Sequence, residues 1–386
     1  MNAGRSATSG PATRNRRGRA GLVVALSALV AAIGCALLVA FGAGAIVSRA
    51  SCASHPDDIT VAAAPDIAAA VTHVAAYFNA RQVDISGHCA HVTVRAVEPA
   101  AEAAQLSGAP HSSSRAVNSG SRAVAAWIPD SSLWIGVARA SRSGAGLVQP
   151  AGVSVARSPL MIAMPRSAAE RVPAFGTSVG WQFLLPQSAG GPAAGLGVQV
   201  ELPDPAHTSA GLATLIEMRQ LLGSGASAAT GFTNFLLSTT ISPAARDAVA
   251  PLAALVTLAG PPRTGQPVTV ASEQAIGRYD KAHPSQPLSA RYPVQGAYEL
   301  DYPCVVTTWD PLQRRAAILF ERALGSAYAR AYLSYEGFRS PGGSAPGWMS
   351  QFGLGIAHLR LAGAAPPSQV DSVLRAWTQT SAARSR

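Results

Sequence analysis

Apolar runs of strand length alternate along this chain with apolar positions at helical spacing. In three places such a run breaks into a short turn of Ser, Thr, Pro and Asp and then resumes as a helix. The three segments are VAAAPDIAAAV (61–71), AWIPDSSLWIGVA (126–138) and VELPDPAHTSAGLATLIEM (200–218). The first helical turn of each would present unpaired backbone N–H groups beside hydroxyl side chains, which suits an anion or a polar solute. Three such turns with no catalytic signature between them favour a binding protein over an enzyme.

The rest of the hydrophobic pattern predicts that the fold begins with a βαβ unit and continues with alternating strands and helices. We expect strands at 59–64, 92–97, 124–128, 197–202 and 267–271, and helices at 67–80, 100–106, 210–222, 228–237, 243–259, 273–279, 313–324 and 327–335. Two more apolar runs, 152–165 and 300–308, have the length to cross from one lobe to another. Strands that alternate with helices predict the α/β class.

The N-terminal region has the pattern of a membrane segment. Five arginines and no acidic residue occur in 1–19, and the stretch 20–47 contains no charge. Roughly 20 apolar residues cross the hydrocarbon core, so 20–47 is predicted to be one transmembrane helix. The arginines place its N-terminal end in the cytoplasm and the main domain outside. A cleaved signal peptide is the alternative, because Ala43-Gly-Ala45 resembles a cleavage site.

Composition narrows the classes of function. The chain of 386 residues is 48% apolar, which is enough to fill the core of a two-lobed domain. The formal net charge is +10, and part of it belongs to the arginines before the apolar segment. No basic run with interleaved aromatic residues follows that segment, so we expect no nucleic-acid partner, and no motif predicts a cofactor.

Three cysteines follow the apolar segment, in what would be an oxidising compartment. Cys52 lies shortly before the first predicted strand, and Cys89 lies directly before the second. Parallel strands joined by a helix start at the same edge of a sheet, so we predict a Cys52–Cys89 disulfide. Cys304 is then expected to be free and buried. His88 and His91 flank Cys89, but further ligands for a tetrahedral site are not evident, and no metal is expected.

Two other patterns suggest alternatives. Gly176-Thr-Ser-Val-Gly180 matches the Gly-x-Ser-x-Gly elbow of serine hydrolases, but the preceding RVPAF is a poor strand, so a Gly-rich loop is favoured. Trp127, Trp134, Trp181 and Tyr302 could stack on a sugar or an aromatic solute. Packing of Trp127 and Trp134 in a core is the simpler expectation.

Seven segments together resemble one known family in their order and spacing. They are ITVAAAPDIAAAV (59–71), WIPDSSLW (127–134), SVARSPLMIAMPR (154–166), LPDPAHTSAGLATL (202–215), SEQAIGRYD (272–280), LDYPCVV (300–306) and YEGFR (335–339). Over about residues 57–377 the chain resembles the bacterial extracellular solute-binding proteins with the type 2 periplasmic-binding fold. It looks most like the actinobacterial subgroup in which that domain precedes a von Willebrand factor A domain.

The resemblance implies an α/β, two-lobed type 2 periplasmic-binding-protein-like fold with a central cleft, preceded by one N-terminal transmembrane helix. The implied division is a basic tail 1–19, a transmembrane anchor 20–47, a linker 48–56, lobe 1 at 57–155 and 300–362, lobe 2 at 156–299, and a C-terminal linker with a short helix at 363–386. The residues implied to face the cleft are Ala64, Pro65, Asp66, Pro129, Asp130, Ser131, Ser132, Thr208, Ser209, Ala210, Gly211 and Tyr302.

The implied function is that of a membrane-anchored extracytoplasmic solute-binding protein. It would capture a small polar or anionic solute between two lobes, for transport or sensing, with a permease or a von Willebrand factor A domain as partner. Asp66 and Asp130 fit poorly with an anion, because carboxylates in the cleft would repel it unless they cap helices. The alternative is a non-catalytic cell-envelope ectodomain that uses the same fold to bind a protein or a cell-wall partner.

Overall fold

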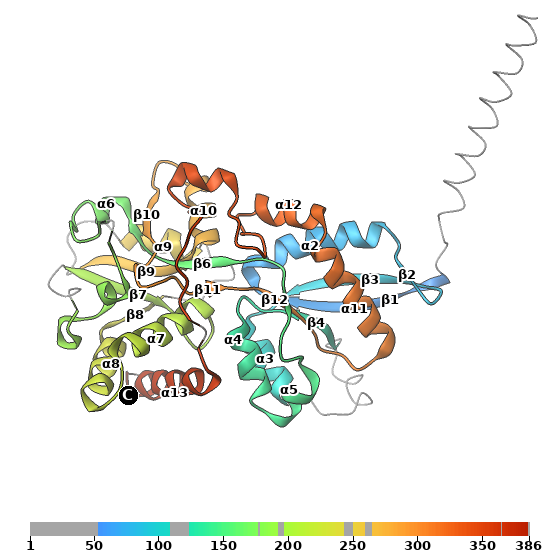
Figure 1. The fold of residues 1–386 in the computed structure, drawn as a ribbon, viewed down its shortest axis with the longest axis horizontal. Coiled ribbons are helices and arrows are strands. Elements are labelled where there is room, and N and C mark those ends of the chain that lie inside the picture. The colour runs from blue at the N-terminus through green and yellow to red at the C-terminus, as the bar shows by residue number, and fades with distance from the viewer. Residues whose placement is uncertain are drawn as a thin grey trace, which may run out of the picture. The chain divides into compact units, whose positions relative to one another are not determined.

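Strands and helices alternate through the part of the chain that the computed structural model describes, which is residues 53–108, 123–176, 178–191, 197–242, 250–258, 265–363 and 365–384. The strands form two six-stranded sheets, and helices pack against each sheet (Figure 1). Each sheet with its helices is one lobe, so the predicted α/β class and the two-lobed architecture are confirmed.

Lobe 1 has a mixed sheet. Its strands follow the order β2 (Asp84–Ile85), β3 (His88–Ala96), β1 (Ala53–Ala63), β4 (Val124–Ile128), β12 (Pro303–Val306) and β5 (Val153–Ser154). Strand β1 pairs in parallel with β3 and β4, whereas β12 pairs antiparallel with β4 and β5. The helices of this lobe are α2 (Pro65–Ala80), α3 (Pro99–Gly108), α4 (Ser132–Arg139), α5 (Arg142–Leu147), α11 (Pro311–Leu324) and α12 (Ala327–Tyr335).

Lobe 2 has a second mixed sheet. Its strands follow the order β10 (Leu288–Arg291), β6 (Ser158–Pro165), β9 (Gln266–Ser272), β7 (Val198–Pro203) and β8 (Thr240–Ser242), and β11 (Glu299–Leu300) also pairs with β6. Strand β7 is parallel to β8 and β9, and β6 is antiparallel to its neighbours. Its helices are α6 (Arg166–Ala169), α7 (Ser209–Leu222), α8 (Ala226–Ser238), α9 (Ala250–Leu258) and α10 (Glu273–Ala282), with 3₁₀ turns at η1 (Trp181–Leu184), η2 (Gln187–Ala189) and η4 (Gly347–Phe352).

Three segments carry the chain between the lobes. The first joins β5 to β6, and the second joins β11 to β12, as predicted from the apolar runs 152–165 and 300–308. The third was not predicted: Arg339 exchanges both backbone hydrogen bonds with Arg157 of the first crossing, at 2.9 and 3.0 Å. The Arg339 side chain then pairs with the buried carboxylate of Glu273 on α10, with N–O distances of 2.6 and 2.8 Å. The first and third crossings are therefore fastened to each other at Arg157 and Arg339.

Several helices begin at a residue whose side chain caps the first turn. Ser131, Thr208, Ser272 and Asp310 accept hydrogen bonds from backbone N–H groups in the first turns of α4, α7, α10 and α11. Helix α2 instead begins with Pro65, whose missing N–H needs no partner at that position. Local sequence alone explains these starts.

One buried apolar cluster includes residues of both lobes, among them Val61 and Trp127 of lobe 1 and Leu202 and Leu212 of lobe 2. All eight residues of β6 are buried, which explains why this strand reads as a continuous apolar run. A second cluster in lobe 2 joins β6, α10 and η4, and it contains Met349. Residues after Arg339 therefore pack with lobe 2, whereas the resemblance assigned them up to 362 to lobe 1.

The C-terminal segment also differs from expectation. Instead of a linker with a short helix, it forms the 18-residue helix α13 (Pro367–Arg384). Val370, Val373 and Trp377 recur on one face of that helix and are buried. Strand β10 and helix α5 were not predicted, because each is a short polar segment without a clear period.

Two N-terminal predictions concern residues outside the described part. The predicted membrane segment 20–47 is one of them, and among the described residues no helix has the length and apolarity to cross a membrane. Cys89 forms a disulfide in the structure, but its predicted partner Cys52 also lies outside the described part, so that pairing stays a prediction. Cys304 is free and buried, as expected.

Candidate functional site

The first predicted turn, at Ala64–Asp66, lies at the end of β1. The Ala64 N–H donates to the Ile128 carbonyl at 2.8 Å, which ties this turn to the end of β4. Asp66 lies in the first turn of α2, where the helix dipole favours a carboxylate. Its Oδ2 accepts a hydrogen bond from the Tyr302 hydroxyl.

The second turn, at Pro129–Ser132, follows β4. Ser131 caps α4 by accepting from the Leu133 N–H at 3.3 Å, and its hydroxyl lies 3.4 Å from the Tyr298 hydroxyl. The Ser132 N–H donates to Asp301 Oδ1 at 2.8 Å. Tyr298, directly before β11, and Asp301 of the second crossing therefore lie against the start of α4.

The third turn, at Thr208–Gly211, opens α7 in lobe 2. Thr208 caps the helix by accepting from the Gly211 N–H at 3.2 Å. Gly211 packs so closely on the preceding turn that a Cβ there would lie 2.1 Å from the Pro203 carbonyl oxygen. Ser209 is fully buried, and its hydroxyl donates to Asp130 Oδ1 at 2.6 Å.

Tyr302 connects the first two turns from the crossing between β11 and β12. Its φ of 38° lies in the left-handed region, which is unfavourable for a bulky residue. Its backbone N–H donates to the Asp130 carbonyl at 3.3 Å, and its carbonyl accepts from the Val155 N–H at 3.1 Å. A residue held in this conformation by hydrogen bonds on both sides is typical of functional sites.

The three turns thus meet where the two lobes touch. We call Asp66, Asp130, Ser131, Ser209 and Tyr302 the interlobe joint. Ser131, Ser209 and Tyr302 each have 0% exposure, and hydrogen bonds join Ser209 to Asp130 and Tyr302 to Asp66. Groups of the protein therefore satisfy part of the hydrogen-bonding capacity of the joint.

The other predicted site residues lie in the same turns but make different contacts. Ala64 and Gly211 are buried by packing, Thr208 acts as a helix cap, and Ser132 is exposed. Pro65, Pro129 and Ala210 shape the turns, and no side-chain hydrogen bond is available to them. The sequence therefore located the turns correctly but did not distinguish the polar joint from its supports.

Several residues of the site were not predicted. Trp134, expected in the core, is buried and also donates its indole N–H to Ser209 at 2.8 Å. Buried tryptophans usually find such a partner, but the sequence did not identify it. Tyr298 and Asp301 lie close in the chain to Tyr302, which the resemblance placed at the cleft. That closeness was the one sequence feature that could have predicted them as site residues.

Carboxyl groups dominate the electrostatics of the joint. Burial raises the pKa of the Asp130 carboxyl to about 7, and the neighbouring Asp66 carboxylate adds to the rise. Burial also raises the pKa of Asp66, by more than the hydrogen bond from Tyr302 lowers it. Asp66 Oδ1 is buried and has no hydrogen-bond partner among the described residues. The joint therefore holds more acceptor oxygens than its own donors satisfy.

A further carboxyl group lies behind the joint. Glu217 of α7 is only 6% exposed, and its Oε1 has no hydrogen-bond partner in the described part of the chain. Burial raises its pKa to about 7. Burial also raises the pKa of the Tyr298 phenol, and the charges of Asp301, Asp130 and Glu217 contribute to the rise. Acidic groups thus face Tyr298 from both lobes.

The structure gives little support to three alternatives suggested by the sequence: an aromatic sugar site, a metal site and a serine hydrolase. Trp127, Trp134, Trp181 and Tyr302 are at most 2% exposed, so no ring face is open for a sugar. Across the described residues, no group of three His, Cys, Asp or Glu side chains is arranged to hold a metal ion. Ser178 follows turns and bends rather than a strand, which does not form a nucleophile elbow.

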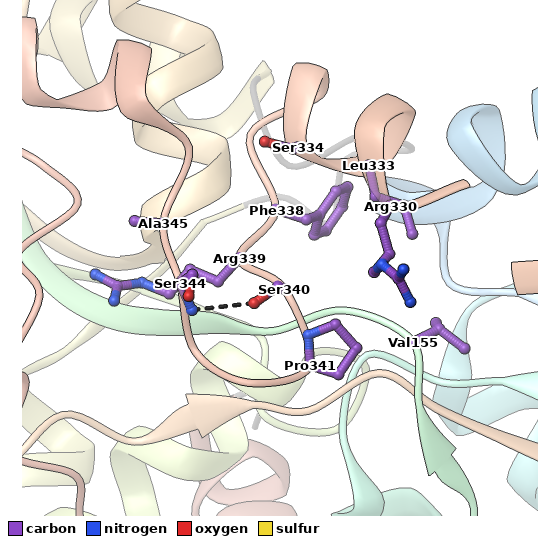
Figure 2. Close-up of a pocket in the computed structure, with 10 residues that line it drawn as sticks. All are labelled: Val155, Arg330, Leu333, Ser334, Phe338, Arg339, Ser340, Pro341, Ser344 and Ala345. Carbon is purple, nitrogen blue, oxygen red and sulfur yellow. Dashed lines mark hydrogen bonds between the residues drawn. The ribbon is translucent and has the colours of Figure 1, made fainter. Parts of the chain in front are cut away.

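A cavity of about 150 Å³ lies at the crossings. Its lining includes Val155 of the first crossing, Phe338 and Arg339 of the third, and Arg330 of α12 (Figure 2). Figure 2 shows the Arg330 side chain directed toward Val155, whereas the Arg339 side chain points away from it. This hollow therefore borders the segments that would bend if the lobes moved.

The fold consists of two lobes joined by crossing segments, with helix N-termini meeting between them. Solved structures agree on the fold. A periplasmic thiamin binding protein has a TM-score of 0.55 and 13% identity, covering 85% of this chain and 96% of its own. The ferric ion-binding protein A of Pasteurella haemolytica has a TM-score of 0.57 and 9% identity, and the match covers 84% of this chain and 98% of that protein. The sulfate-binding protein SubI of Mycobacterium tuberculosis H37Rv has a TM-score of 0.50 and 15% identity, and the match covers 74% of this chain and 87% of that protein.

The family is shown by sequence. The model described as bacterial extracellular solute-binding protein matches residues 59–339, which is more than half of the chain. The chain therefore belongs to the family of bacterial extracellular solute-binding proteins, and residues 59–339 form an extracytoplasmic binding domain. No curated protein matches the sequence significantly. At 9–15% identity, the solved structures support the fold alone.

Proposed function

We propose that this protein captures a small polar solute at the interlobe joint, outside the cytoplasm, for transport or sensing. One observation carries the proposal: polar side chains from three separate strand-to-helix turns and one crossing converge where the lobes meet. Lobes that turn about crossing segments can separate and close again around a ligand. A solute would enter when Ser209 of lobe 2 leaves Asp130 of lobe 1.

The chemistry of the joint favours a solute that donates hydrogen bonds or carries positive charge. Asp66 and Asp130 are close enough for one carboxylate to raise the pKa of the other. Asp66 Oδ1 has no partner among the described residues, so a donor can be added there without displacing a protein group. An ammonium or guanidinium group would offset the repulsion between the two carboxylates, whereas an anion would increase it.

The test is a thermal-shift panel on the full chain in mild detergent near pH 8, where both carboxyls are more ionised. The panel holds amines, guanidinium compounds, amino acids, sugars, short peptides and oxyanions. A ligand at a hundredfold excess over its Kd adds about 2.7 kcal/mol to the stability of the folded state, which raises Tm by several degrees. We expect the amines or guanidinium compounds to give this shift.

Matched variants assign the shift to the joint. Asp130→Asn keeps an oxygen that can accept from Ser209 but removes the charge, so it should abolish the shift. Glu170→Gln makes the same change at an exposed position of lobe 2 and should leave the shift intact. Stabilisation by oxyanions alone would support capture but contradict the preference for cations. No stabilisation by any solute would contradict capture.

The complete burial of Ser131, Ser209 and Tyr302 favours a second function. If the lobes stay closed, the domain would act as a non-catalytic cell-envelope module that binds a protein or a cell-wall partner. In that case the panel gives no shift, and Ser209→Ala lowers Tm without altering any ligand response. We further propose that residues 20–47 anchor the chain in the membrane and that a permease or a von Willebrand factor A domain on another chain is its partner.

A further inference from the structure

Helix α13 contacts both lobes and lies outside the region that matches the family. The match ends at Arg339, whereas α13 begins at Pro367. It packs against α7 and α8 of lobe 2 and also against α4 of lobe 1. In Figure 1 the helix (dark red) lies beside α7 and α8, with one end toward α3 and α4. A helix in this position is affected by any movement between the lobes.

The contact face of α13 is apolar and continuous. Val370, Val373 and Trp377 are at most 2% exposed, and they belong to the same buried cluster as Leu133 of α4 and Leu212 of α7. Side chains of this size gain stability in proportion to the apolar area that they bury. Separating α4 from α13 would expose this face to water, so the contact favours the closed arrangement.

Polar contacts attach α13 to lobe 2. The Trp377 indole N–H donates to Asp204 Oδ1 at 3.1 Å, and the Gln220 amide of α7 donates to Gln369 at 3.3 Å. Because these partners belong to lobe 2, α13 would stay with that lobe when the lobes separate. The apolar contact with α4 is then the one that must break.

Asp204 organises the turn that presents Ser209 to the joint. Its Oδ1 also accepts from the Ala206 N–H at 2.9 Å, and its carbonyl accepts from the N–H groups of His207 and Thr208 at 3.0 and 2.9 Å. Thr208 then caps α7, directly before Ser209. Trp377 is therefore connected through Asp204 to the residue that joins lobe 2 to Asp130.

We infer that α13 is a clamp that holds the two lobes closed in the absence of solute, with Trp377 as a positioning residue for the turn that carries Ser209. Solute entry then requires α13 to part from α4. Because a closed form that excludes solute lowers the apparent affinity, the strength of this contact sets how readily the protein binds. The inference does not depend on which solute is bound.

Hydrogen–deuterium exchange on the full chain in mild detergent, without added solute, tests the clamp. Trp377→Ala removes both the apolar contact and the indole N–H. We expect amides at the start of α4 (Leu133, Trp134) and of α7 (Gly211, Leu212) to exchange at least about tenfold faster, because local opening sets their protection. Amides of β1 and β9 should keep their protection, which also shows that the variant folds.

Two further variants separate positioning from packing. Trp377→Phe keeps the apolar ring but loses the N–H, so exchange should rise mainly in the 204–208 turn. Gln379→Ala changes an exposed position of the same helix and should have no effect. Unchanged exchange at α4 and α7 in Trp377→Ala would overturn the inference. An equal rise throughout both sheets would also overturn it, because α13 would then stabilise the fold without acting between the lobes.

Discussion

At the scale of single residues, the joint brings two carboxyl groups together where the lobes touch. Asp66 and Asp130 come from different turns of lobe 1, and each receives one hydroxyl donor, from Tyr302 and Ser209. Burial favours the protonated form of both, and the Asp130 carboxyl, with a pKa of about 7, keeps its proton below that pH. Proton release and solute binding should therefore be coupled.

The first prediction concerns pH and Asp130. Its pKa rises from 3.8 to about 7 on folding, so between those values the folded protein keeps a proton that the unfolded chain has lost. The free energy of unfolding should therefore fall as pH rises from about 4 to about 7 and level off above. In Asp130→Asn this fall should be smaller. At about pH 8 the free energy of unfolding of the variant should exceed that of the wild type by roughly 1–3 kcal/mol.

Urea unfolding at about pH 5 and pH 8 measures this difference. Glu217→Gln provides a comparison, because that buried carboxyl also has a pKa of about 7 but makes no bond to Ser209. A wild type whose stability rises over the same range would refute the assignment of a protonated joint.

At the scale of elements, the start of α7 is the most constrained part of the site. The resemblance places Gly211 at the cleft, and the structure shows that this glycine packs closely on the preceding turn. Its missing Cβ allows the first turn of α7 to lie against the backbone at Pro203 and Pro205. The close approach fixes the direction in which α7 presents Ser209 to lobe 1.

The second prediction compares two helical glycines. Gly211→Ala would place a methyl group against the Pro203 carbonyl, so it should destabilise the fold by about 1–3 kcal/mol. Gly136→Ala in α4 meets no atom within 4 Å and should stabilise by roughly 0.5–1 kcal/mol. Denaturant midpoints of the two variants check the signs. Equal effects would show that α7 can shift away from the turn at little cost.

At the scale of the whole molecule, the crossings and α13 lie on different parts of the interlobe contact. The crossings are fastened at Arg157 and Arg339, whereas α13 packs on α4 and α7. A movement of the lobes about the crossings would therefore have to break the contact between α13 and α4.

The third prediction concerns anchoring. Full-length protein should stay with membranes after an alkaline carbonate wash. Leu29→Arg/Leu37→Arg should release it, since each arginine costs about 2.5–3.5 kcal/mol at the centre of a membrane helix. Leu29→Ala/Leu37→Ala is the matched control and should stay membrane-bound. A shortened product in the soluble fraction of the wild type would instead indicate a cleaved signal peptide.

The sequence by itself determined much of the local structure. Apolar periodicity located most strands and helices, and Pro65, Ser131 and Thr208 marked where three helices begin, because capping needs only neighbouring residues. The same turns led to the prediction that Asp66, Asp130 and Ser209 contact solute.

Only the tertiary structure decided how those turns relate. Whether Ser209 reaches Asp130, whether the space between them is open, and which lobe the residues after Arg339 join all depend on contacts between distant segments. The roles of Trp134, Glu217 and Trp377 depend on partners more than 70 residues away or in another lobe, as in the bond from Trp134 to Ser209 with a separation of 75. Such contacts leave no period in the sequence, because they are fixed by the packing of two sheets rather than by neighbours along the chain.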